Sequence, residues 1–291
     1  MKPDDAPLVP PGAQRAPVAI WRDGRLRQDS DWLADEVPVA LVYNGISHAV
    51  MLASPADLED FALGFSLSEG LLRTADELYG VDIEPGCDGL TLQLEVASAA
   101  LARLKERRRS LAGRTGCGLC GTDSLAQVRR ALPAPGTFGL PPVLTTAAVA
   151  AALRGLRAHQ GLQQLTGATH AAAWCAPDGT VRLAREDVGR HNALDKLIGA
   201  LQRTRRDARA DAATRAACAP DQGFVCITSR ASVEMVQKAA SVGIGTLVAV
   251  SAPTALAVQV AREAGLALAG FARGDDLVAY TEAARFGLPA A

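Results

Sequence analysis

Short apolar runs that alternate with short helical segments fill the C-terminal part of the chain and constrain its fold most. Residues 224–228, 246–250 and 266–271 have the length and apolar content of buried strands, and residues 232–242 and 254–264 between them are typical of helices. Strands that alternate with helices form βαβ units, in which the strands are parallel and the crossovers are nearly always right-handed. The pattern therefore predicts an α/β domain with a largely parallel sheet.

Prolines divide the rest of the chain. Pro133, Pro135, Pro141 and Pro142 mark a linker, so we expect the α/β domain to cover residues 143–291 and to have an α/β/α layering. The further elements that we expect within it are a helix over 145–164, a hairpin over 169–184, a helix over 192–204 and a mobile insertion over 205–222.

The N-terminal half has the pattern of a small α+β domain over residues 18–110. Asn44-Gly45 lies between two apolar stretches and predicts a hairpin over 37–52. The further expected elements are a helix that opens near Asp57, two strands within 80–96 and a basic helix over 98–110. Residues 1–17 are rich in proline and lack the basic start and apolar core of a secretory signal, so we expect a disordered leader.

Charge and hydropathy narrow the classes of function. The net charge of -1 gives no general case for binding nucleic acid or a membrane surface. No run reaches the ~18 apolar residues of a membrane span, and we expect a cytoplasmic protein. Without a secretory signal, the six cysteines do not indicate a disulfide framework. Cys175 and Cys226 lie in apolar runs and should be buried, whereas Cys87 and Cys218 lie in polar segments and suggest no role.

Cys117 and Cys120 form a Cys-x-x-Cys pair inside the glycine-rich stretch 113–121. Glycines leave the backbone free to adopt positive φ, and nearby cations favour the reactive thiolate over the thiol. We expect residues 111–142 to be a mobile loop and linker that presents the two sulfur atoms. The basic residues that precede or enter the loop are Arg103, Lys105, Arg107, Arg108, Arg109 and Arg114.

Two close cysteines serve zinc binding, dithiol redox chemistry or sulfur carriage. Structural zinc needs four ligands, and the chain has no second close pair, so only a metal shared across a dimer stays open as an alternative. Zinc deaminases need His-x-Glu, but two alanines follow His170. A thioredoxin-like motif follows a strand and opens a helix, whereas this pair lies among glycines. We therefore rank sulfur carriage above dithiol redox chemistry and expect no resident metal.

Polar residues follow the predicted strands where each strand ends. Ser229 and Arg230 follow the first strand, and Arg273 follows the last within 271–276. Open α/β sheets bind ligands beyond the carboxyl ends of their strands, and Ser232 can cap a helix whose amides favour anions. The edge therefore predicts a phosphate or pyrophosphate site. The alternative is that the serines are caps and the arginines are solvated.

A second polar cluster lies at the junction of a predicted strand and helix. Glu186, Asp187, Arg190 and His191 crowd around a glycine within 185–196. Such a junction often carries function, and His191 is a candidate proton relay. Helix capping and surface charges are the simpler account of part of the cluster.

Together these motifs resemble the FdhD family of formate dehydrogenase accessory sulfurtransferases. The resemblance covers about 36–284 and departs from the family at Val233, where an aromatic is expected, and at Ala168, where a second glycine is common. The matching motifs are the Cys-x-x-Cys loop, 186–196, 229–238, 251–254 and 270–274.

The resemblance implies a cytidine-deaminase-like C-terminal domain, a homodimer and a sulfurtransferase. Such proteins take sulfur from a cysteine desulfurase as a persulfide and pass it to the molybdenum bis(guanine dinucleotide) cofactor, their bound substrate, for a molybdenum-dependent formate dehydrogenase. Cys117 would carry the sulfur and Cys120 would assist. A thioredoxin-like dithiol oxidoreductase and a non-catalytic cofactor-binding chaperone remain alternatives. The residues implied to contact the guanine dinucleotide are Phe271, Ala272, Arg273, Gly274, Asp275 and Asp276.

Overall fold

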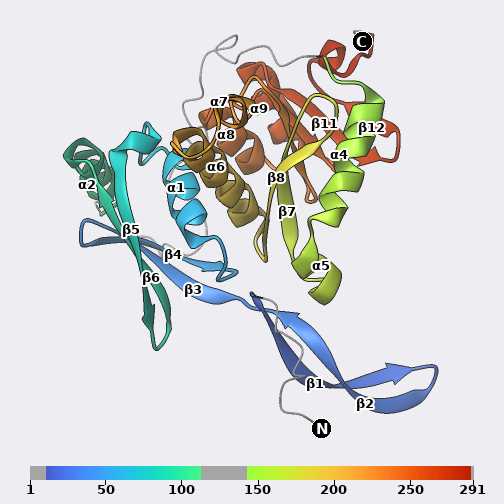
Figure 1. Cartoon of the computed structure of the whole chain (residues 1–291), viewed down its shortest axis with the longest axis horizontal. Helices are drawn as coiled ribbons and strands as arrows, with labels where there is room; N and C mark the ends of the chain where they lie inside the picture. The colour runs from blue at the N-terminus through green and yellow to red at the C-terminus, as the bar shows by residue number, and fades with distance from the viewer. Residues whose placement is uncertain (1–10, 113–142, 290–291) are drawn as a thin grey trace.

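The computed structural model describes residues 11–112 and 143–289, and side chains from 107 to 112 are outside the description (Figure 1). Three sheets organise this part of the chain: a two-stranded ribbon, a four-stranded sheet and a six-stranded sheet. Among the described residues, no helix has the length and apolar character needed to cross a membrane.

The six-stranded sheet has the order β12-β11-β10-β9-β7-β8 and is mixed rather than largely parallel. Only β9, β10 and β11 run parallel, because the helices α8 and α9 separate them. β7 and β8 form a hairpin, β12 returns directly from β11, and each of these strands pairs antiparallel. The bounds are β7 His170–Cys175, β8 Val181–Asp187, β9 Phe224–Ile227, β10 Thr246–Ala249, β11 Ala267–Arg273 and β12 Asp276–Ala279.

Helices cover both faces of this sheet, as predicted for an α/β/α domain. Alternate residues of the central strands enter two separate hydrophobic clusters, one shared with α4 and the other with α6, α8 and α9. The expected helix over 145–164 is two helices, and the expected mobile insertion contains α7 and the buried Cys218. The bounds are α4 Thr146–Ala158, α5 Gly161–Thr166, α6 Arg190–Arg206, α7 Ala212–Ala217, α8 Val233–Ser241, α9 Ala255–Ala264 and the 3-10 helix η2 Ala283–Phe286.

The N-terminal unit has the predicted α+β composition. Its sheet has the order β4-β3-β6-β5, with β3 and β6 parallel. Asn44 and Gly45 have φ values of 44° and 78°, so the predicted hairpin turn is confirmed. The bounds are β3 Val37–Tyr43, β4 Ile46–Ala53, α1 Leu58–Ser68, η1 Ala75–Glu77, β5 Leu78–Gly86, β6 Gly89–Val96 and α2 Ser98–Ala112.

Helices α1 and α6 join the two predicted domains through one hydrophobic core. A Cβ atom at Gly64 would lie 1.7 Å from the carbonyl oxygen of Asp195, and one at Gly199 would lie 1.9 Å from that of Asp60. Only glycine permits so close an approach of the two helix backbones. The N-terminal unit therefore packs directly against the sheet domain (Figure 1).

The ribbon corrects the expected leader. β1 Ala13–Arg22 pairs with β2 Arg25–Ala34, so residues 13–17 are part of a strand rather than a disordered segment. Asp23 and Gly24 have φ values of 51° and 73°, which a two-residue hairpin turn requires. The ribbon extends away from the rest of the molecule (Figure 1).

Candidate functional site

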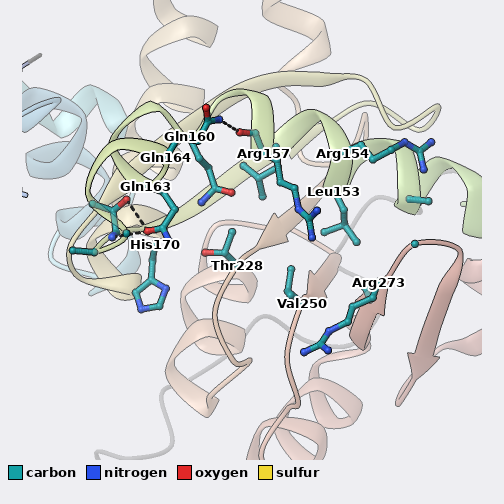
Figure 2. Close-up of a pocket in the computed structure, with 17 residues that line it drawn as sticks. Leu153, Arg154, Arg157, Gln160, Gln163, Gln164, His170, Thr228, Val250 and Arg273 are labelled. Atoms are coloured by element: carbon teal, nitrogen blue, oxygen red, sulfur yellow. Dashed lines mark hydrogen bonds between the residues drawn. The ribbon is translucent and has the colours of Figure 1, made fainter. Parts of the chain in front are cut away.

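A cavity of about 1070 Å³ opens at the edge of the six-stranded sheet. Three strands, β9, β10 and β11, end at this edge and β7 begins there, while α4 and α5 form the opposite wall (Figure 2). Its volume slightly exceeds the usual range of small-molecule sites, which is about 300–1,000 Å³. The lining residues that matter below are Arg154, Arg157, Gln163, His170, Thr228 and Arg273.

Arginine side chains from two elements give the cavity its positive charge. Arg157 extends from α4 and Arg273 from β11, on either side of Val250 (Figure 2). Neither has an ion-pair partner within residues 11–112 and 143–289. Arg154 lies three residues before Arg157, on the same face of α4. Exposed guanidinium groups without a carboxylate partner are suited to bind phosphate.

The predicted segment 271–276 forms the tip of the β11–β12 hairpin. Arg273 and its two neighbours, Ala272 and Gly274, line the cavity. Phe271 is 47% exposed and has a φ of 51°, a left-handed conformation that costs free energy for an aromatic residue. The tip thus presents an exposed aromatic residue two positions before an arginine that lines the cavity. Asp275 and Asp276 are exposed at the turn itself.

The other predicted edge residues lie outside the cavity lining. Ser229 is buried, and its hydroxyl donates to the carbonyl oxygen of Arg230 at 3.1 Å. The Arg230 side chain is exposed. Ser232 stands at the N-cap position of α8 but makes no capping bond, so the expected cap is wrong.

His170 is the titratable residue at the cavity wall. Burial lowers its pKa, and the positive charge of Arg190 and the neighbouring His191 lower it further. A histidine with a lowered pKa is neutral near pH 7 and can accept a hydrogen bond or a proton. His191 Nε2 in turn lies 2.6 Å from a Glu234 carboxylate oxygen, and this hydrogen bond lowers the pKa of Glu234.

The cluster over 185–196 joins the two units of the molecule. Lys196 and Asp187 form a fully buried ion pair of 2.6 Å. Lys196 also donates to the carbonyl oxygen of Ser54 at 2.9 Å, and Asp187 accepts from the Ser54 N–H at 3.0 Å. Asn192 spans the same junction, from Asp187 to the Leu52 carbonyl oxygen. The ion pair and these hydrogen bonds connect residues 187–196 to residues 52–54. The cluster therefore holds the sheet domain on the N-terminal unit.

Glu186 has a different task beside the cavity. Its carboxylate accepts hydrogen bonds from the N–H groups of Leu162 and Gln163, each at 2.9 Å, and from the Thr169 hydroxyl. It therefore satisfies the first amides of α5, which has no side-chain cap of its own. Because Gln163 lines the cavity, Glu186 fixes one of its walls.

Cys117 and Cys120 lie outside the described residues, as does most of the expected loop over 111–142. The chain that carries them enters the described structure at Val143, shortly before α4 begins at Thr146. Arg103, from the basic run, forms an ion pair with Glu77 at 2.5 Å. Cys175 and Cys226 are buried as predicted, and Cys87 is exposed.

Sequence reasoning missed the α4 wall of the cavity. Arg154 and Arg157 were recognised only as part of a helix, although arginines spaced three apart in an alanine-rich helix signal a basic face.

Among the described residues, no group of three or more His, Cys, Asp or Glu side chains could hold a metal ion.

Comparison with known proteins places the chain in a family. The profile of the FdhD/NarQ family matches residues 34–287. The chain belongs to the FdhD/NarQ family. The match includes both cysteines of the Cys-x-x-Cys pair and every residue of the cavity lining, whereas almost all of the ribbon precedes it.

Relatives within the FdhD/NarQ family are similar over nearly their whole length. A protein from Variovorax paradoxus is 57% identical over 291 residues, which are 100% of this chain and 99% of the relative. One from Cupriavidus necator is 56% identical over 276 residues, 95% of this chain and 91% of the relative. Both are named "Sulfur carrier protein FdhD".

A solved structure has the same fold. The crystal structure of a candidate formate dehydrogenase accessory protein from Desulfotalea psychrophila superposes with a TM-score of 0.71 at 20% identity. The superposition covers 95% of this chain and 100% of the other.

Proposed function

We propose that this protein is a sulfurtransferase for the molybdenum bis(guanine dinucleotide) cofactor. It takes sulfur from a cysteine desulfurase onto Cys117 as a persulfide and delivers it to the cofactor, which a molybdenum-dependent formate dehydrogenase then uses. The observation that carries the proposal is the cavity at the sheet edge, whose two facing arginines have no ion-pair partner among the described residues. The names of the relatives support sulfur carriage.

The cavity fits one guanine nucleotide arm of the substrate. Arg157 and Arg273 offer guanidinium groups for a diphosphate from two directions. Phe271, exposed at the hairpin tip, offers a ring against which a purine can stack. Gln163 and the neutral His170 supply further hydrogen-bonding groups on the cavity wall.

Sulfur transfer needs no further group in its first step. The Cys117 thiolate attacks the outer sulfur of the desulfurase persulfide, a new S–S bond forms, and the desulfurase cysteine leaves as a thiolate. For delivery, the Cys120 thiolate attacks the inner sulfur of Cys117 and releases sulfide to the cofactor. This step leaves a Cys117–Cys120 disulfide, which a cellular thiol must reduce before the next cycle. The two thiolates thus supply the two electrons that convert sulfane sulfur to sulfide.

The loop cysteine is tested by replacement in cells. Cys117→Ala should abolish maturation of formate dehydrogenase, measured as enzyme activity in an extract from a strain that lacks the wild-type protein. Cys87→Ala is the matched control, because Cys87 is an exposed cysteine on the β5–β6 turn. Full activity of the Cys117 variant would refute the role of Cys117 as the sulfur carrier.

The cavity is tested by nucleotide binding. Arg273→Ala should weaken the binding of guanosine diphosphate at least about tenfold in calorimetry, because a charge-assisted hydrogen bond contributes about 1.5–3 kcal/mol. Arg230→Ala is the control, since Arg230 is exposed and outside the cavity lining. Equal affinities of the two variants would remove the sheet-edge cavity from the proposal while leaving sulfur carriage standing.

A further inference from the structure

The ribbon of β1 and β2 is a sheet without a third strand among the described residues. It extends away from the body and touches it near α5 (Figure 1). A two-stranded ribbon is marginally stable alone in water, and each free edge offers backbone groups to another strand. An exposed ribbon of ten residues per strand therefore needs a stabilising contact beyond the pairing of its own two strands.

The two edges of the ribbon differ. Pro17, opposite Ser30, lacks an N–H, and proline is tolerated in a strand where the missing donor would point outward. The outer edge of β1 is therefore interrupted at its middle. β2 has no proline, and its outward N–H groups at Ser30 and Trp32 bind the carboxylates of Asp29 and Asp31, each at 2.8 Å. Asp29 also forms an ion pair with Arg27 of its own strand at 2.8 Å. Because the side chains of Arg27, Asp29 and Asp31 are exposed, these contacts are weak and can be exchanged for other partners.

The charges of β2 are arranged for pairing with a copy of itself. Arg25 and Arg27 precede Gln28, and Asp29 and Asp31 follow it, all four on the face opposite to that of Gln28. In an antiparallel pair centred on Gln28, Arg27 lies opposite Asp29 of the second copy and Arg25 lies opposite Asp31. A strand edge that carried charges of one sign only would instead repel the same edge of a second copy.

We propose that β2 pairs antiparallel with β2 of a second copy of this chain, about a two-fold axis at Gln28. The two ribbons then form one four-stranded sheet, in which each arginine–aspartate pair occurs twice. Asp29 and Asp31 turn to the arginines of the second copy and free the amides of Ser30 and Trp32 for the new ladder. On the other face, the 65% exposed Leu26 gains the second ribbon as a neighbour. The pairing goes beyond the proposed function and does not depend on sulfur transfer.

Charge reversal tests the pairing in the full-length protein. One variant combines Arg25→Glu with Arg27→Glu, and the other combines Asp29→Arg with Asp31→Arg. Each should dissociate, with a dimer dissociation constant raised about 100-fold or more, because every cross-strand pair becomes repulsive. An equimolar mixture should restore a dimer, since one strand is then wholly acidic and the other wholly basic. Sedimentation velocity at micromolar concentration measures all four samples.

Two results would overturn the proposal. A wild-type protein that sediments as a monomer has no such interface. Variants that stay as dimeric as the wild type have their interface elsewhere. The mixture guards against misfolding, because a variant that had lost its fold could not regain a dimer by mixing.

Cross-linking tests the register. Gln28→Cys should form an intermolecular disulfide, because paired residues on the axis have Cα atoms about 5.5 Å apart. Ser30→Cys is the control, since its copy lies about 13 Å away along the strands. Peptide mass spectrometry identifies the link and separates it from the native cysteines. Links at residue 28 alone support the register, and equal linking of both variants or none at residue 28 refutes it.

Discussion

Lys196→Met should destabilise the protein by about 3 kcal/mol, at the lower end of the cost of breaking a buried ion pair. The change removes the ammonium group and roughly keeps the length of the side chain. Lys196 and Asp187 are both 0% exposed, so the remaining carboxylate cannot be hydrated. It still accepts hydrogen bonds from Ser54, Gly189 and Asn192, which hold part of its charge. These three donors keep the loss near the lower limit.

The partner variant should cost more. Asp187→Asn leaves the fully buried Lys196 ammonium without a negative charge among its described contacts, so we expect about 4–5 kcal/mol. The double variant should lose less than the sum of the two, with a coupling of at least about 1 kcal/mol. A domain of ordinary stability has about 5–15 kcal/mol, so either single change endangers folding at growth temperature.

Urea denaturation followed by circular dichroism measures all four proteins of this cycle. Glu59→Gln is the control, because it breaks the half-exposed Arg203–Glu59 pair and should cost at most about 1 kcal/mol. A loss below about 1 kcal/mol for Lys196→Met, or strict additivity in the double variant, would refute the reasoning. The cluster would then not be what holds the two units together.

Three further changes test other parts of the structure. Gly199→Ala should cost at least about 2 kcal/mol in urea denaturation, because the new methyl group meets a carbonyl of α1, whereas Gly161→Ala, with open space around it, should be nearly neutral. NMR titration should find the pKa of His170 below its usual value, and Arg190→Gln should raise it by removing a positive charge. Because the pKa of His170 is lower in the folded state, the unfolded state binds more protons there, and the free energy of unfolding should rise as pH rises through the histidine range. This rise should be smaller in the Arg190→Gln variant. Glu186→Gln should weaken guanosine diphosphate binding in calorimetry by loosening α5, with circular dichroism showing an intact fold.

Local patterns predicted the elements that depend on local chemistry. Asn44-Gly45 can hardly serve anything but a tight hairpin turn, and β9 to β11 with their two helices were visible as alternating apolar segments. The prediction of a largely parallel sheet was wrong because β7 and β12 belong to hairpins at the two sides of the sheet, and these hairpins pair antiparallel. The direction in which a hairpin joins a sheet is a tertiary property, and no sequence spacing encodes it.

Contacts between distant segments explain the remaining differences. Asp187 suggested a functional site and Lys196 a surface charge, whereas both are buried and share a partner, Ser54, that lies more than a hundred residues earlier in the chain. The ribbon escaped notice because charged and polar residues together occupy most of β2, and a strand in water lacks the alternation of a strand on a core. Of the cavity, the sequence predicted the β11 end with Arg273, but it could not place α4 opposite it.

The central claim is that Cys117 carries sulfur, and intact-protein mass spectrometry tests it most directly. The full-length protein is incubated with a cysteine desulfurase and cysteine, and peptide mapping then locates any adduct. The account predicts a gain of one sulfur atom on Cys117, removed by a thiol reductant and absent from Cys117→Ala but not from Cys87→Ala. A Cys117–Cys120 disulfide without any sulfur gain would favour a dithiol oxidoreductase, and guanine nucleotide binding without an adduct would favour a chaperone. Either result would contradict sulfur carriage.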